Sequence, residues 1–117
     1  MATSMKISIY PQIRQRVLSD LRAIVKDVSK FELQFDLLLF GSCAWGYAVF
    51  YSDIDLMVVT ESELSIDEQI MFQSLENHYD FPVHFCFRTK DRLIESKERF
   101  ECQVKASCYR IFSCNIL

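Results

Sequence analysis

The sequence predicts one small α/β domain, and three observations support this fold class. The chain has 117 residues, half of them apolar, which is enough for one hydrophobic core and too few for two. Apolar residues recur at helical spacing in one segment and as short continuous or alternating runs in others. No repeat or Gly/Pro/Ser-rich linker divides the sequence. We therefore expect a single domain over residues 1–117.

The first expected element is an amphipathic helix that begins near Pro11. Its apolar residues stand three or four positions apart along the chain: Ile13, Val17, Leu21, Ile24, Val25 and Val28. This spacing places them on one helix face, and proline is well suited to the first turn. The basic residues of this segment fall mostly off that face, so we interpret them as a solvated surface.

Two strands are expected next, over residues 35–40 and 53–59. The first segment is almost continuously apolar, which favours a strand buried on both faces. The second alternates at its start. Period-two geometry therefore sends Asp53, Asp55 and Met57 to one face of the sheet and the apolar residues between them to the other.

A second helix is expected from Ser65 to about Tyr79. Ser65 provides a capping hydroxyl, and Asp67 and Glu68 place carboxylates near the positive end of the helix dipole. The two remaining elements follow Pro82. Residues 83–87 alternate as a third strand, and a last helical region is expected from about residue 89 to residue 107.

Charge and cysteine content limit the classes of function. The net charge of -3 leaves no basic surplus to neutralise a nucleic-acid backbone. Five cysteines, an odd number without a CxxC pair, suit free thiols in a reducing compartment. The first residues lack the apolar core of a signal peptide, and no apolar run approaches the roughly 20 residues that cross a bilayer. We therefore expect a cytoplasmic protein that contacts neither nucleic acid nor membrane directly.

Asp53 and Asp55 are the main candidates for chemistry. Their spacing alone carries no information, because the composition predicts about two such carboxylate pairs by chance, and Glu61/Glu63 is a second one. Their position at the entrance of an apolar strand distinguishes them, since unpaired charges are costly there and like charges repel. A divalent cation held by both would relieve both costs, and oxygen ligands favour Mg²⁺.

A glycine-serine turn stands before this pair, separated from it by a ten-residue spacer. Gly41 has no side chain and Ser42 carries a hydroxyl, so both can approach phosphate oxygens closely. A phosphate site and a metal site would then face one another.

The string GSCAWGYAVFYSDIDL, residues 41–56, resembles the GS-x10-DxD signature of the DNA polymerase β-type nucleotidyltransferase superfamily, and in particular its minimal branch, the MNT proteins. The resemblance implies a small mixed sheet backed by helices, two Mg²⁺ ions, and transfer of AMP from ATP to a hydroxyl. On the matching positions, Asp53 and Asp55 would hold the metals, while Gly41 and Ser42 would contact the nucleotide phosphates.

His84 stands where the superfamily usually has a third carboxylate. Imidazole is a poorer ligand for Mg²⁺ but accepts Mn²⁺, and it can act as a general base near neutral pH. His84 is therefore either a catalytic residue beside Asp53 and Asp55 or an ordinary hydrogen-bonded strand residue. A third alternative is that His84 leaves the enzyme weakened. Asp80 is a poorer replacement, because it is expected beyond the end of the strand.

The small size of the chain implies that the acceptor hydroxyl is on another chain. Proteins of the MNT branch typically accompany a helical HEPN partner in a pair that resembles a toxin-antitoxin system. The resemblance therefore implies a hetero-oligomer in which this chain is the antitoxin and AMPylates the HEPN toxin. The alternatives are a pseudoenzyme that occludes the toxin, and a nucleotidyltransferase for small molecules such as antibiotics. The uncharged residues 111–117 are either a chain-chain contact, an inner strand or a helix end.

Overall fold

The computed structural model describes residues 11–41 and 53–117, with the backbone alone for residues 11–14. Within these residues, four strands form one sheet in the order β3-β2-β1-β4. Their bounds are Asp36–Phe40 for β1, Ile54–Thr60 for β2, Val83–Thr89 for β3 and Tyr109–Phe112 for β4. β1 pairs antiparallel with both β2 and β4, whereas β2 pairs parallel with β3. The predicted mixed sheet is confirmed.

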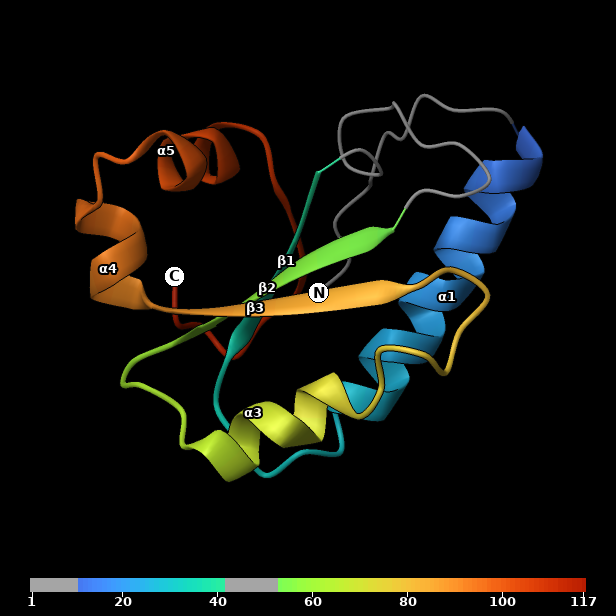
Figure 1. Cartoon of the computed structure of the whole chain (residues 1–117), viewed down its shortest axis with the longest axis horizontal. Helices are drawn as coiled ribbons and strands as arrows, with labels where there is room; N and C mark the ends of the chain where they lie inside the picture. Colours follow the sequence, from blue (N-terminus) through green and yellow to red (C-terminus); the bar gives the residue numbers. More distant parts are fainter. Residues whose placement is uncertain (1–10, 42–52) are drawn as a thin grey trace.

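Helices lie on both sides of this sheet (Figure 1). The helices α1, Pro11–Val28, and α3, Ile66–Gln73, cover one side. The helices α4, Lys90–Glu95, and α5, Arg99–Ala106, cover the other. None of the helices in the described ranges is long and apolar enough to cross a membrane.

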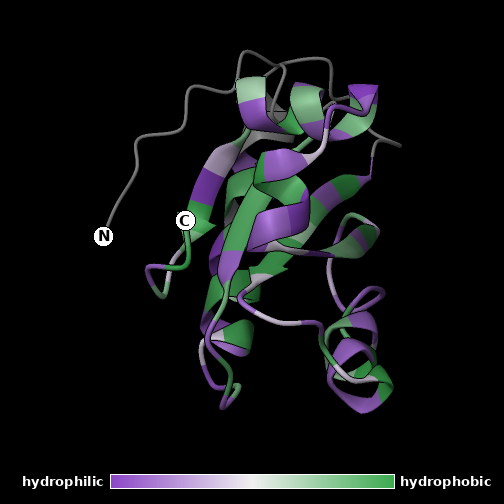
Figure 2. Cartoon of the chain, turned by 90° about the vertical axis from the view of Figure 1, so that its left-hand side faces the viewer, coloured by the Kyte–Doolittle hydropathy of each residue, from purple (hydrophilic) through white to green (hydrophobic). Residues whose placement is uncertain are grey.

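The strand β2 supplies side chains to two cores. Ile54, Leu56 and Val58 pack with α1 and with Phe72 of α3 in the larger core. Met57 and Val59 pack on the other side, against α4 and α5. The predicted alternation is therefore confirmed for this strand, and Figure 2 shows apolar stretches along the strands beside helices of mixed polarity.

The helix α3 has the predicted start but ends earlier than predicted. Ser65 and Glu68 form a capping box, in which each side chain accepts a hydrogen bond from the backbone of the other residue. The prediction of a helix to Tyr79 was wrong, because the chain leaves α-helical bonding after Gln73. The amide of Glu76 donates to the carbonyl of Gln73 at 3.1 Å, an i→i−3 turn bond. These turns reverse the chain before β3.

The last helical region lies within the predicted residues 89–107 and consists of two helices, α4 and α5. Ser96 has an extended backbone, ψ 136°, which ends α4. The reversal brings the buried Glu101 of α5 against Arg88 of β3, whose Nε donates to Oε2 of Glu101 at 3.0 Å. The hydrogen bond from Arg88 lowers the pKa of Glu101, although burial opposes that shift. The helical spacing of the sequence gave no signal of this ion pair.

Candidate functional site

The predicted site residues that the structure describes meet at one corner of the sheet, where β1 ends and where β2 and β3 begin. The strand register places Phe40 opposite Asp55, and Asp55 opposite His84. Antiparallel pairing on one side of β2 and parallel pairing on the other thus join three distant chain segments (Figure 1). Ser42 lies outside the described residues.

Gly41 contacts the carboxylate of Asp55 closely. Its φ is +79°, a left-handed conformation that side chains other than glycine rarely adopt. A Cβ atom at this position would lie 3.2 Å from Cγ of Asp55 and would overlap its Oδ2. Both the backbone conformation and the close contact therefore require glycine, and they give the residue a role in positioning Asp55 in addition to the predicted phosphate contact.

We expect Gly41→Ala to destabilise the fold by about 1–3 kcal/mol, because it combines left-handed strain with a displaced Asp55 side chain. Urea unfolding measures this loss. Gly41→Asn is the comparison, since asparagine tolerates a positive φ but still carries a Cβ. Equal losses for both variants would assign the effect to the contact with Asp55. A Gly41→Ala variant as stable as the parent would contradict the described geometry.

Asp53 and His84 form the second contact of the site. Nε2 of His84 lies 3.0 Å from Oδ2 of Asp53, and the two side chains are 61% and 42% exposed, respectively. His84 is thus a solvent-facing residue at the start of β3, on the strand face that Asp55 also occupies. The structure therefore brings the carboxylates of Asp53 and Asp55 and the imidazole of His84 together. The sequence predicted that the two carboxylates share one face of the sheet.

The electrostatics of Asp55 favour a bound cation. Burial raises the pKa of this carboxyl, and the neighbouring charge of Asp53 raises it further, while the charge of His84 lowers it. The fold thus disfavours negative charge on Asp55 in the absence of a counterion. A divalent cation shared with Asp53 would supply that counterion.

The donor set suits a hard divalent ion. In the described residues, no group of three or more His, Cys, Asp and Glu side chains is arranged so that it could hold a metal ion. Mg²⁺ does not require such a group, because it commonly takes one or two carboxylates and completes its coordination with water and substrate phosphates. Asp53 and Asp55 would provide those carboxylates here.

Glu76 is a residue that the sequence interpretation missed. Its backbone oxygen accepts from the amide of Val83 at 3.0 Å, and its Oε2 accepts from the amide of Phe85 at 2.8 Å. These bonds hold the strand on either side of His84. No sequence motif marks Glu76, because its role depends on the turns that follow α3. Asp80, the rejected replacement for a third carboxylate, is exposed and lies 3.7 Å from Arg16.

Comparison with known proteins gives one family match and a structural likeness. The sequence profile of a family described as "Nucleotidyltransferase domain" matches residues 19–107, well over half of the chain. A chain in a toxin-antitoxin complex solved with AMP-PNP has a similar fold, with a TM-score of 0.51 and 22% identity. The match covers 87% of this chain and 74% of that chain.

A second solved structure is less similar. It contains a tri-AMPylated HEPN toxin from Shewanella oneidensis in complex with an MNT antitoxin. The TM-score is 0.43 at 23% identity, and the match covers 87% of this chain and 71% of that chain. No protein with a curated description matches the sequence.

Proposed function

Because this chain belongs to the nucleotidyltransferase domain family, we propose that it transfers AMP from ATP to a hydroxyl of a HEPN-type partner in the cytoplasm and thereby acts as an antitoxin. The observation that carries the proposal is the corner formed by Gly41, Asp53, Asp55 and His84. The GS-x10-DxD string supports the family branch. The fold shared with a chain of a toxin-antitoxin complex solved with AMP-PNP is consistent with this choice of partner and nucleotide.

In this proposal, Asp53 and Asp55 hold the divalent cations, with Mg²⁺ expected and Mn²⁺ an alternative. The bound metal would lower the pKa of the attacking hydroxyl and neutralise the departing pyrophosphate. The acceptor oxygen bonds to the α-phosphorus as the bond to the β-phosphate oxygen breaks. The peptide of Gly41 allows the phosphates a close approach, and Ser42 is proposed to contact them.

His84 is proposed to accept the proton of the acceptor hydroxyl. Its Nε2 lies beside the Asp53 carboxylate at 3.0 Å, which leaves Nδ1 to take the proton. The exposure of this side chain allows a hydroxyl from another chain to reach it. Asp53 would then both hold metal and orient the imidazole.

The direct test is incubation of the chain with its HEPN-type partner and labelled ATP, with Mg²⁺ or Mn²⁺. We expect label on the partner, at a hydroxyl that mass spectrometry identifies. No labelling with either metal would rule out the catalytic form. Labelling of a small molecule in place of the partner would support the alternative of a small-molecule nucleotidyltransferase.

A second candidate function is occlusion of the toxin by a pseudoenzyme. The observation that favours it is His84 at the position of the usual third carboxylate, because imidazole is a weak ligand for Mg²⁺. Under this alternative the chain binds its partner without modifying it.

Substitution of His84 separates these candidates. If His84 is a general base, His84→Ala should lower AMP transfer by about 10²-fold or more, while His84→Asp should stay within about tenfold of the parent. Single-turnover rates with Mg²⁺ and Mn²⁺ measure both effects. His78→Ala, another exposed histidine, is the control and should have no effect. A large gain of transfer in His84→Asp would indicate that the natural site is impaired.

A further inference from the structure

The strand β3 lies at one edge of the sheet, and Figure 1 looks onto this edge, with β3 in front of β2 and β1. The amide of Ile54 donates to the carbonyl of Pro82 at 2.8 Å. In a parallel pair with this register, the backbone amides and carbonyls of the even-numbered residues of β3 bond to β2. The backbone groups of Val83, Phe85, Phe87 and Thr89 therefore point away from the sheet.

Along this outward edge, the amides of the first part are bonded and those of the second part are open. Glu76 accepts from the amides of Val83 and Phe85, as described above. In the part of the chain that the structure describes, the carbonyl of Phe87 accepts from Nη1 of Arg88 at 2.8 Å, whereas the amides of Phe87 and Thr89 have no acceptor. An open edge of this kind pairs readily with another extended backbone.

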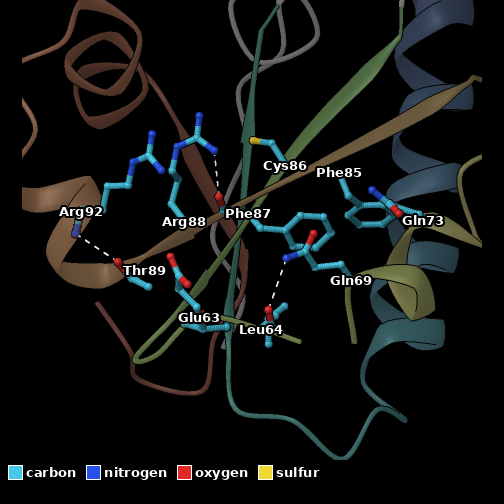
Figure 3. A pocket seen from close by; sticks show the side chains of 11 residues that line it. Glu63, Leu64, Gln69, Gln73, Phe85, Cys86, Phe87, Arg88, Thr89 and Arg92 are labelled. Carbon is cyan, nitrogen blue, oxygen red and sulfur yellow. Dashed lines mark hydrogen bonds between the residues drawn. The ribbon is translucent and has the colours of Figure 1, made fainter. Parts of the chain in front are cut away.

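A surface cavity of about 410 Å³ lies along this open edge (Figure 3). Leu64, Phe85 and Phe87 supply its apolar surface. Gln69 and Gln73 of α3 lie on one side of it, where the two phenylalanine rings point, while Arg88 points to the opposite side of β3. The cavity thus offers room for a side chain directly beside the unpaired amides of Phe87 and Thr89.

Apolar and basic side chains extend this surface. On α3, Ile66 and Ile70 are 76% and 51% exposed, and the three-residue spacing places Ile66 beside Gln69 and Ile70 beside Gln73 of the cavity wall. On the other side, Arg88 is engaged by Glu101, and Lys90 lies 4.0 Å from Glu61.

Arg92 provides a positive charge at this surface that can bind an incoming group. Its side chain lines the cavity and the residue is exposed. Its guanidinium has no acceptor within residues 11–41 and 53–117, although its backbone amide donates to Oγ1 of Thr89. A carboxylate on an incoming segment would therefore find a charged partner at this end of the edge.

We propose that an extended segment of the partner protein adds to β3 along Phe87–Thr89, with an apolar side chain in the cavity and a carboxylate against Arg92. This inference rests on the proposed function for the existence of the partner. A slender segment fits better than a second copy of this chain. Glu76 occupies one end of the edge and α4 begins at the other, directly after Thr89, so two such edges would obstruct each other.

Hydrogen exchange, followed for individual amides by NMR in the free chain and in its complex with the HEPN-type partner, tests this inference. The amides of Phe87 and Thr89 should become protected at least about tenfold more in the complex. Those of Cys86 and Arg88 should change little, because they are already bonded to β2. Unchanged exchange at Phe87 and Thr89 in a stable complex would overturn the docking site but leave the proposed function intact.

Two charge-bearing variants test the side-chain part of the surface. Arg92→Glu and Ile70→Lys should each weaken partner binding about tenfold or more in calorimetric titrations. The matched controls are Arg22→Glu on α1 and Ile94→Lys, whose side chain is as exposed as that of Ile70 at 51%. Equal weakening by variant and control would overturn the proposal. Self-association of the chain through Ile70, seen by sedimentation, would assign the surface to a second copy and would also overturn the proposed docking site. If no complex with the partner forms at all, both the docking site and the proposed function are overturned.

Discussion

The variant Asp53→Asn/Asp55→Asn should lose AMP transfer by at least about 10³-fold, the largest effect on activity that we expect. Both substitutions keep the side-chain shape but remove the negative charges that the bound metals require. The remaining residues of the corner, Gly41 and His84, carry no negative charge that could replace the two carboxylates in binding a cation. Single-turnover labelling of the partner measures the loss.

Loss of folding would not explain this result. Because burial and Asp53 raise the pKa of Asp55 above its ordinary value, the ionised carboxylate is less favoured in the fold than in the unfolded chain. Its removal should therefore leave the thermal midpoint unchanged or slightly raised. Mg²⁺ should raise the midpoint of the parent by mass action and should leave that of the double variant unchanged.

The control variant is Glu95→Gln/Glu98→Gln, which removes the same charge from two exposed positions. It should transfer AMP as fast as the parent and keep the response to Mg²⁺. If the Asp53/Asp55 variant labelled the partner as well as the parent, the metal assignment would be wrong. If it lost transfer but still neutralised the toxin in cells, occlusion would account for the antitoxin activity.

The alternation of residues 53–59 was the strongest sequence signal, and it carried over to the structure because period-two geometry fixes the face of every side chain in a strand. It placed Asp53 and Asp55 on one face and the apolar residues on the other. The roles of Asp53, Asp55, Gly41, Ser42 and His84 in metal and nucleotide binding stay predictions.

Contacts between distant segments could not be predicted in this way. The steric need for glycine at position 41 depends on Asp55, which only the register of β1 and β2 brings against it. The ion pair between Arg88 and Glu101 joins β3 to α5 across the division between α4 and α5. Local spacing contains neither relation, because both arise when the sheet assembles.

Asp36 is the clearest example of a residue whose role the sequence did not reveal. In the sequence it interrupts an apolar run, and in the structure it is fully buried. Its carboxylate accepts four hydrogen bonds from the segment that follows β4, at 2.9–3.2 Å, from Ser113 Oγ and from the amides of Cys114, Ile116 and Leu117. The uncharged residues 111–117 therefore include the end of an edge strand and a turn bound to Asp36. Of the three alternatives for this segment, the inner strand was wrong.

Asp36→Ala should destabilise the fold by about 3–5 kcal/mol, the largest effect on stability that we expect. The substitution leaves the donors of the terminal turn without an acceptor, and it removes the partner of Arg110, whose Nη1 lies 3.6 Å from Oδ2. Urea unfolding at neutral pH measures the loss. Ser113→Ala removes one donor and keeps the carboxylate, so it should cost only about 1 kcal/mol. Similar losses for the two variants would contradict the central role of Asp36.

Acid titration tests whether the negative charge of Asp36 is the cause of this stabilisation. Burial opposes ionisation of this carboxyl, but the hydrogen bonds from Leu117, Ser113, Ile116 and Cys114 outweigh it and lower its pKa below 3.8. A lowered pKa means that the ionised form stabilises the fold above pH 3.8 and that this contribution is lost as pH falls through the folded pKa. Asp36→Asn keeps one acceptor oxygen but cannot titrate. The stability difference between the parent and Asp36→Asn should therefore shrink as the pH falls below 3.8, and a difference that is constant with pH would show that shape, not charge, holds the terminal turn.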